Sequence, residues 1–231
     1  MSLSQANMKR AQVLLHALVT RGVEDFVVSP GSRNTPLILA LEWLLEKRGP
    51  DNLRIHRMLD ERSAGFFALG LGRIHGVPAA LVCTSGTAAA HYFPALIEAS
   101  QSHIPLLVLS ADRPQELRGV GSLQTIDQNK LFGDYTRLYL DLTAPTVDGP
   151  ADAWVAACGA RAFDAACGYN AGPVHLNLPF REPLWTAGEP LPDFELPVVP
   201  QNLVANRTLS TQQLENLGQS IAAYKRGVII A

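Results

Sequence analysis

Residues 23–36, VEDFVVSPGSRNTP, contain the pattern that decides the fold. The stretch VEDFVVS is largely apolar and contains several β-branched side chains, which indicates a short buried strand. Gly31 then permits a tight turn, Thr35 is the expected cap of a helix, and Pro36 suits the first helical position. A strand that leads directly into a helix in this way is the beginning of a βαβ unit.

The same alternation of strand and helix continues on both sides of this stretch. Strands are expected at residues 23–29, 53–59, 79–84, 105–110, 137–142 and 174–178. Helices are expected at residues 5–21, 35–47, 63–74, 86–101 and 151–167. This alternation predicts the α/β class, with a parallel six-stranded sheet and helices on both of its faces. The order of the strands in the sheet does not follow from the local pattern.

The composition changes after this domain, which we expect to span residues 1–181. Residues 179–200 hold six of the 16 prolines, so residues 182–205 are predicted to form an extended proline-rich linker. Residues 206–231 then start a second domain, with a helix at 210–225 and a strand at 227–231. We therefore expect the chain to be the N-terminal part of a longer protein with a truncated middle domain.

Composition excludes several classes of protein. The 231 residues are 47% hydrophobic and 17% charged with a net charge of −2, which favours a folded globular chain and gives no basic face for nucleic acid. Three cysteines without a C-x-x-C pair are expected to be reduced thiols in a cytoplasmic protein. The sequence contains no histidine pair with metal-ligand spacing and no apolar run long enough to span a membrane, so we expect neither metal ligands nor a membrane span in this chain.

Candidate functional residues follow the predicted strands, because ligands of open α/β sheets bind beyond the carboxyl ends of the strands. Ser32 and Arg33 follow the first strand and could bind a carboxylate or a phosphate. The alternative is a structural turn whose arginine faces solvent. Glu61 follows the second strand and could hold or move a proton, although acidic residues are also common in the first turn of a helix.

Two further groups follow the third and fourth strands. Residues 84–87, TSGT, could wrap a phosphate, but they lack the glycine spacing of the known nucleotide-binding motifs. Arg113 follows the fourth strand and is a second candidate cation at the same edge, and Gln124 lies in the loop after it. Taken singly, none of these groups identifies a reaction.

Taken together, five stretches form a pattern that resembles a known family. They are SPGSRNTP (29–36), DERSAGFFALGLGRIHG (60–76), TSGTAAAHYFPALIEA (84–99), LSADRPQEL (109–117) and QTIDQ (124–128). In this order and spacing they resemble the N-terminal, pyrimidine-binding domain of thiamine-diphosphate-dependent enzymes. Within that superfamily they are similar to the 2-succinyl-5-enolpyruvyl-6-hydroxy-3-cyclohexene-1-carboxylate (SEPHCHC) synthases of menaquinone biosynthesis. The resemblance covers about residues 10–181.

The resemblance implies a role for the glutamate and for two of its neighbours. Glu61 matches the glutamate that hydrogen-bonds N1′ of the cofactor pyrimidine and promotes loss of the thiazolium C2 proton. A group that moves a proton in this way is typically worth about 10²- to 10⁴-fold in rate. Thr87 and Pro30 match positions beside the pyrimidine. The cofactor would be thiamine diphosphate with Mg²⁺ or Mn²⁺, the metal ligands being expected in the missing C-terminal part.

The resemblance also implies the substrates. Ser32, Arg33, Arg113 and Gln124 match substrate-facing positions, and the two arginines would bind the carboxylates of 2-oxoglutarate and isochorismate. The family pattern further implies a homo-oligomer, a dimer or tetramer, in the full-length protein, and a fragment that is inactive alone. His91 and Leu123 depart from the residues common at their positions.

Two alternatives remain open at this point. The chain could come from another thiamine-diphosphate-dependent 2-oxoacid decarboxylase or carboligase. It could also be a non-catalytic α/β binding domain, a reading that the carboxylate of Glu61 disfavours.

Overall fold

The computed structural model describes residues 1–49, 52–149, 151–201 and 208–228. Contacts along the chain divide it into two units, Met1–Pro200 and Gln201–Ala231. The first unit contains the sheet and all the candidate functional residues. Among the described residues, no helix combines the length and the apolar character needed to cross a bilayer.

The sheet of the first unit has six strands, and every neighbouring pair is parallel. The strands are β1 (Asp25–Val28), β2 (Arg54–Arg57), β3 (Ala79–Cys83), β4 (Leu106–Asp112), β5 (Leu138–Asp141) and β6 (Pro173–Pro179). Their order in the sheet is β2-β1-β3-β4-β6-β5. The predicted parallel six-stranded α/β fold is therefore confirmed, and the structure adds the strand order.

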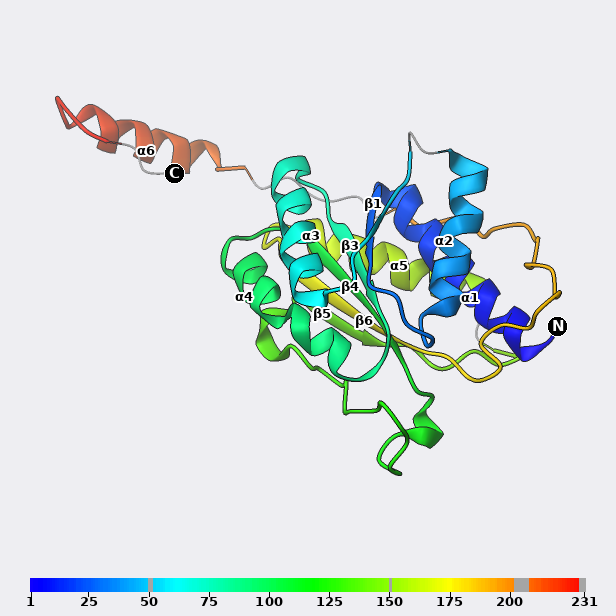
Figure 1. Ribbon diagram of the computed structural model, residues 1–231. Helices are drawn as coiled ribbons and strands as arrows, with labels where there is room; N and C mark the ends of the chain where they lie inside the picture. The colour runs from blue at the N-terminus through cyan, green and yellow to red at the C-terminus, as the bar shows by residue number, and fades with distance from the viewer. Residues whose placement is uncertain (50–51, 150, 202–207, 229–231) are drawn as a thin grey trace. The chain divides into compact units, whose positions relative to one another are not determined.

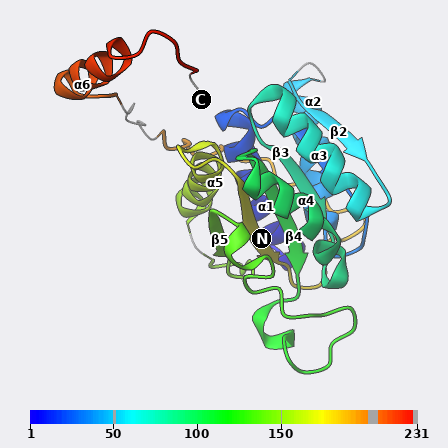
Figure 2. The ribbon, with the colours of Figure 1, turned by 90° about the vertical axis from the view of Figure 1, so that its left-hand side faces the viewer.

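Helices cover both faces of this sheet. They are α1 (Leu3–Arg21), α2 (Thr35–Arg48), α3 (Glu61–His75), α4 (Phe93–Gln101) and α5 (Asp152–Cys167). Residues of α1, α2 and α5 share one apolar core with one face of the sheet, and residues of α3 and α4 share a second core with the other face. Figures 1 and 2 show α3 and α4 on the side of the sheet opposite to α1.

Side chains of each central strand alternate between these two cores, as the pleat of a strand requires. Val28 and Val82 point into the core with α1, α2 and α5, whereas their neighbours Val27 and Leu81 point into the core with α3 and α4. Strands buried on both faces read as continuous apolar runs, which is why they are visible in the sequence.

Two expectations about helix ends are wrong in detail. Asn34, not Thr35, is the N-cap of α2, and Thr35 is already helical. The helix expected at residues 86–101 is a 3₁₀ helix, η1 (Gly86–Tyr92), followed by α4. Pro94 lies in the first turn of α4 and has no N–H to donate, which is consistent with a new helix beginning there.

Residues 180–200, the described part of the proline-rich segment within the first unit, form neither helix nor strand, as their composition predicts, but they pack against the rest of this unit. Leu191, Phe194 and Leu196 lie against the core that contains α1. Gln12 of α1 donates a hydrogen bond to Pro192 O at 3.1 Å, and Lys47 pairs with Asp193 at 2.8 Å. The segment is therefore held along the helices, while the domain boundaries at 181 and 205 stay a prediction.

The second unit contains one described helix, α6 (Thr211–Ala222), which confirms the helix expected at residues 210–225. Its N-cap Ser210 forms a capping box with Gln213. The strand expected at residues 227–231 falls largely on residues 229–231, which lie outside the described residues.

Candidate functional site

The carboxyl edge of the sheet brings the predicted residues together, and the strand order identifies its central crevice. The order reverses between β1 and β3, and ligands of open α/β sheets bind at such a switch point. Gly31, after β1, lies directly against Thr84, after β3, so that a Cβ at position 31 would lie 2.5 Å from Thr84 Cβ. Only glycine allows the two loops to approach this closely.

Glu61 is the first residue of α3 and lies at this edge. The preceding Asp60 caps the helix, accepting a hydrogen bond from Ser63 N at 2.7 Å. Glu61 itself is half-buried, and within the described residues its carboxylate has no hydrogen-bond or ion-pair partner. Burial raises the pKa of the Cys83 thiol, and the negative charge of Glu61 raises it further. Glu61 is thus an unpaired carboxylate near the end of β3.

Pro30 and Thr87, the other two predicted cofactor contacts, are exposed on the loops after β1 and β3. Pro30 lines an apolar hollow of about 230 Å³ together with Leu41, Ile55 and Met58. Thr87 lies in η1, directly after Gly86, whose φ of +85° favours glycine.

Arg33 lies beneath the surface of this edge. Its guanidinium Nη1 donates to Phe180 O at 3.0 Å, and Nη2 donates to Glu182 Oε1 at 2.7 Å. The Arg33 side chain is 5% exposed, whereas that of Glu182 is 71% exposed. Ser32, the neighbouring predicted substrate residue, is exposed and lines a hollow with Glu182.

Arg113 and Gln124 converge on one residue, Ser85. Arg113 Nη1 donates to Ser85 Oγ, and Gln124 Nε2 donates to Ser85 O at 3.2 Å. Burial lowers the pKa of Arg113, and the positive charge of Arg33 lowers it further, while Glu182 opposes both effects. The charge of each guanidinium group therefore acts on the other. The structure brings Arg113 and Gln124 to Ser85, and it brings Arg33 and Ser32 to Glu182, so all four predicted substrate residues lie around these two side chains.

A buried polar network lies below the arginines, and sequence reasoning missed it. Gln128 accepts a hydrogen bond from Gly86 N at 2.9 Å and donates one to Asn177 Oδ1 at 2.8 Å. Asn177 Nδ2 donates to Asp112 Oδ2 at 2.8 Å. Asp112 accepts from the backbone N of Arg113 at 2.7 Å. This chain of contacts connects the TSGT loop to the backbone of Arg113.

His175 occupies the inner end of that network. Its Nε2 lies 2.7 Å from Ser110 Oγ, and Ser110 in turn donates to Asn177 Oδ1 at 2.9 Å. Burial lowers the pKa of His175 to about 3, so the imidazole is neutral at physiological pH. The alternation in VHLNL at residues 174–178 was the available signal: two polar residues on the same side of a buried strand need partners.

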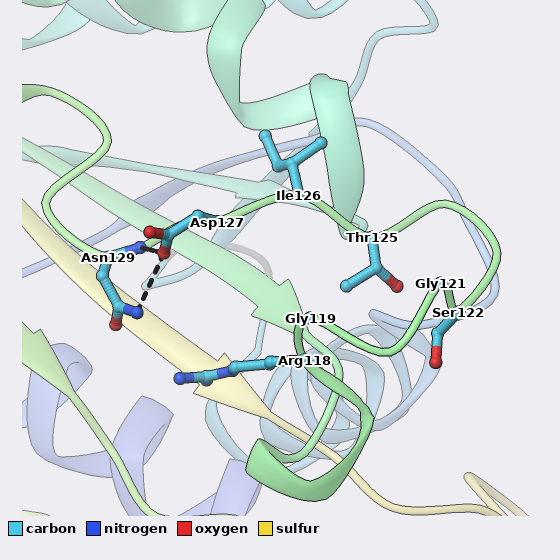
Figure 3. A pocket seen from close by; sticks show the side chains of 8 residues that line it. All are labelled: Arg118, Gly119, Gly121, Ser122, Thr125, Ile126, Asp127 and Asn129. Atoms are coloured by element: carbon cyan, nitrogen blue, oxygen red, sulfur yellow. Dashed lines mark hydrogen bonds between the residues drawn. The ribbon is translucent and has the colours of Figure 1, made fainter.

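Arg118 closes the outer end of the network. Its guanidinium pairs with Asp112 at 2.9 Å and with Asp141, at the end of β5, at 2.8 Å. Beside it lies a cavity of about 420 Å³. Figure 3 shows the residues that line this cavity, which are Arg118, Gly119, Gly121, Ser122, Thr125, Ile126, Asp127 and Asn129. In it Asp127 Oδ1 accepts hydrogen bonds from the backbone and side chain of Asn129. The loop that carries Gln124 therefore begins at an ion-paired arginine and contains the hydrogen-bonded residues Asp127 and Asn129.

Chemically, this edge offers a carboxylate that can exchange a proton and two guanidinium groups that can bind carboxylates. Within the described residues, no group of three or more His, Cys, Asp or Glu side chains is arranged to hold a metal ion.

The fold and this edge define a class of enzyme domain. The chain belongs to the thiamine pyrophosphate enzyme family, because residues 8–131 match the family model described as "Thiamine pyrophosphate enzyme, N-terminal TPP binding domain". Thiamine pyrophosphate is another name for thiamine diphosphate, so the predicted superfamily is confirmed. The matched residues include Glu61 and the four predicted substrate residues but not Glu182.

Curated relatives point to one branch of that family. The chain is 46% identical over 226 residues to the 2-succinyl-5-enolpyruvyl-6-hydroxy-3-cyclohexene-1-carboxylate synthase of Chloroflexus aurantiacus and 44% identical over 234 residues to that of Myxococcus xanthus. It is 51% identical over 173 residues to the synthase of Chlorobaculum parvum. The first two alignments cover 94% and 97% of this chain but 36% and 39% of the relatives. The predicted resemblance to SEPHCHC synthases is therefore confirmed, and the chain spans between 28% and 39% of the length of these relatives.

Proposed function

We propose that this chain is the N-terminal, pyrimidine-binding part of a SEPHCHC synthase. Such an enzyme decarboxylates 2-oxoglutarate with thiamine diphosphate and adds the succinyl unit to isochorismate. One observation carries the proposal beyond the similarity itself: a single sheet edge holds both the unpaired carboxylate of Glu61 and the guanidinium pair Arg33 and Arg113.

Thiamine diphosphate, when bound, supplies the carbanion chemistry of the reaction, and the protein supplies binding, orientation and electrostatics. The residues present fit its pyrimidine. Glu61 is half-buried, and its carboxylate is unpaired among the described residues. Thr87 and Pro30 are exposed on the loops that follow β3 and β1 at the same edge. Glu61 would hold N1′ through a hydrogen bond and keep a proton available there. We assign it as the catalytic residue of this chain.

Ser32, Arg33, Arg113 and Gln124 would bind the substrates. A guanidinium group presents a planar fork of donors that matches a carboxylate, and both proposed substrates are anionic. A binding site for them at this edge is supported by the approach of Arg33 and Arg113. The loop positions of Arg113 and Gln124 against Ser85 would set the distance between the two arginines and the cofactor.

The remaining features belong to the same proposal. Mg²⁺ or Mn²⁺ would be held by oxygen ligands from sequence outside this domain, of the kind that Mg²⁺ prefers. The active protein would be a cytoplasmic homo-oligomer, a dimer or tetramer, in which another domain closes the cofactor cleft.

The test compares 2-oxoacids in the full-length protein that contains this chain, loaded with thiamine diphosphate and Mg²⁺. We expect CO₂ release from 2-oxoglutarate, dependent on isochorismate, and much slower release from pyruvate. Preference for pyruvate would instead assign the chain to another decarboxylase or carboligase of the superfamily. Absence of turnover with either acid would favour a non-catalytic domain.

A further inference from the structure

We propose that Glu182 is an internal carboxylate ligand of Arg33 that a substrate carboxylate must displace. The inference rests on the proposed function, because it concerns how the arginine pair receives an anionic substrate. It adds a specificity-determining residue that lies outside the matched family segment, in the chain that follows β6.

Arg33 and Glu182 are buried to very different extents. Arg33 is 5% exposed and is anchored from below by Phe180 O, so the guanidinium is fixed in place. Glu182 is 71% exposed and holds Arg33 Nη2 at 2.7 Å. Opening this pair moves only the exposed carboxylate and leaves the buried arginine where it is. An exposed carboxylate gains little from such a pair, so it can be exchanged for another.

The same guanidinium also has a donor without an acceptor. Arg33 Nε is buried and has no hydrogen-bond partner among the described residues. A buried donor without an acceptor is unfavourable, and it is uncommon in folded proteins. Arg33 therefore still has a donor to offer, which a carboxylate binding in place of Glu182 could use.

The ion pair of Arg33 and Glu182 lies beside a hollow on the surface. Glu182 lines an open hollow of about 610 Å³ with Ser32, Thr35, Pro183, Leu184 and Trp185. Ser32 is a substrate-facing residue by its match to the family, identified independently of Glu182. The negative charge of Glu182 also acts on Arg113, so this carboxylate partly neutralises both arginines. An anion that enters the hollow therefore meets Glu182 at the position where it would bind.

The experiment measures the affinity of the 231-residue chain for succinate, a simple dicarboxylate probe, by calorimetric titration at constant ionic strength. If Glu182 occupies Arg33 for most of the time, the apparent affinity for succinate is reduced in proportion to the fraction of molecules in which Arg33 is free. We expect Glu182→Gln to bind succinate about three- to tenfold more tightly than the wild type, which corresponds to about 0.7–1.4 kcal/mol. Asp193→Asn is the matched control, because it removes a carboxylate paired with Lys47 in the same segment, and it should leave the affinity unchanged.

A double variant locates the effect. In an Arg33→Ala background, the gain from Glu182→Gln should disappear, since the two changes act on one pair. Unchanged or weaker binding by Glu182→Gln, with an unfolding midpoint equal to that of the wild type, would overturn the inference and make Glu182 a residue that positions Arg33. Succinate affinity does not depend on Glu61 or on the cofactor, so this outcome is distinct from failure of the proposed function, which is tested by turnover of 2-oxoglutarate.

Discussion

Two parts of the same sheet edge differ in how their charges are satisfied. Glu61, after β2, has a carboxylate with no partner among the described residues, whereas the guanidinium groups after β1 and β4 are bound to Glu182, Phe180 O and Ser85. The unpaired carboxylate of Glu61 can form a hydrogen bond with a ligand without first breaking a contact within the described residues. A guanidinium that is already paired has a fixed position, and at Arg33 a carboxylate ligand would take the place of Glu182.

Removal of the unpaired carboxylate of Glu61 should have the largest effect. Glu61→Gln in the assembled enzyme should slow hydrogen–deuterium exchange at cofactor C2 by at least about 10²-fold, because an amide cannot take the place of the acid in proton transfer. The fold should be unaffected, since Glu61 makes no hydrogen bond or ion pair within the described residues. Exchange at the wild-type rate in this variant would remove Glu61 from the mechanism.

Removal of either paired guanidinium group should affect the use of substrate. Arg113→Ala and Arg33→Ala should each weaken the use of a carboxylate substrate by about ten- to a hundredfold, because one charge-assisted pair is worth about 1.5–3 kcal/mol. Affinity for thiamine diphosphate should change far less. Steady-state kinetics with both substrates separates the two effects. An arginine whose loss leaves KM and kcat unchanged is structural only.

The network under the arginines should matter for folding more than for chemistry. Gln128→Leu removes the acceptor of Gly86 N and a donor to Asn177. Leaving one buried group unpaired costs about 1–3 kcal/mol, and urea unfolding of the chain should report a loss in this range. The exposed Gln115→Leu serves as the control and should change the free energy of unfolding little. Equal effects of the two changes would mean that the network does not stabilise the edge.

The pH dependence of stability tests the inner end of that network. The pKa of His175 is lowered to about 3 by burial, against about 6.5 in the unfolded chain. The unfolded state therefore binds the extra proton between these values, and the contribution to stability is complete above pH 6.5 and is lost as the pH falls toward 3. His175→Gln should reduce the slope of unfolding free energy against pH by up to about 1.4 kcal/mol per unit in this window. The exposed His75→Gln should change the slope much less, and an equal change would contradict the assignment.

Much of the fold could be predicted because its signals are local. Buried parallel strands such as β3 and β4 are continuous apolar runs, and Gly22 ends α1 in the left-handed conformation that glycine favours. Strand order could not be predicted, because it depends on how helices pack across the sheet. The switch from η1 to α4 also depends on packing, since Tyr92 is fully buried there.

The site was predictable as single residues rather than as a set of contacts. Family motifs indicated Glu61, Arg33 and Arg113, which are close to their own strands in sequence. Glu182 could not be linked to Arg33, because the two are separated by 149 residues and meet only through the fold. His175 and Asn177 carried a local signal, the polar alternation in a buried strand, but their partner Ser110 is 65 and 67 residues away in sequence.

The central claim is that this chain supplies one wall of a cofactor site that another domain completes. Calorimetric titration of the 231-residue chain with thiamine diphosphate and Mg²⁺, beside the full-length protein, tests it most directly. The hydrogen bond from Glu61 contributes about 0.5–1.5 kcal/mol, far less than the roughly 8.2 kcal/mol that micromolar affinity requires. We expect micromolar binding by the full-length protein and none in that range by the chain alone. Micromolar binding by the chain alone, or CO₂ release from 2-oxoglutarate, would contradict the claim.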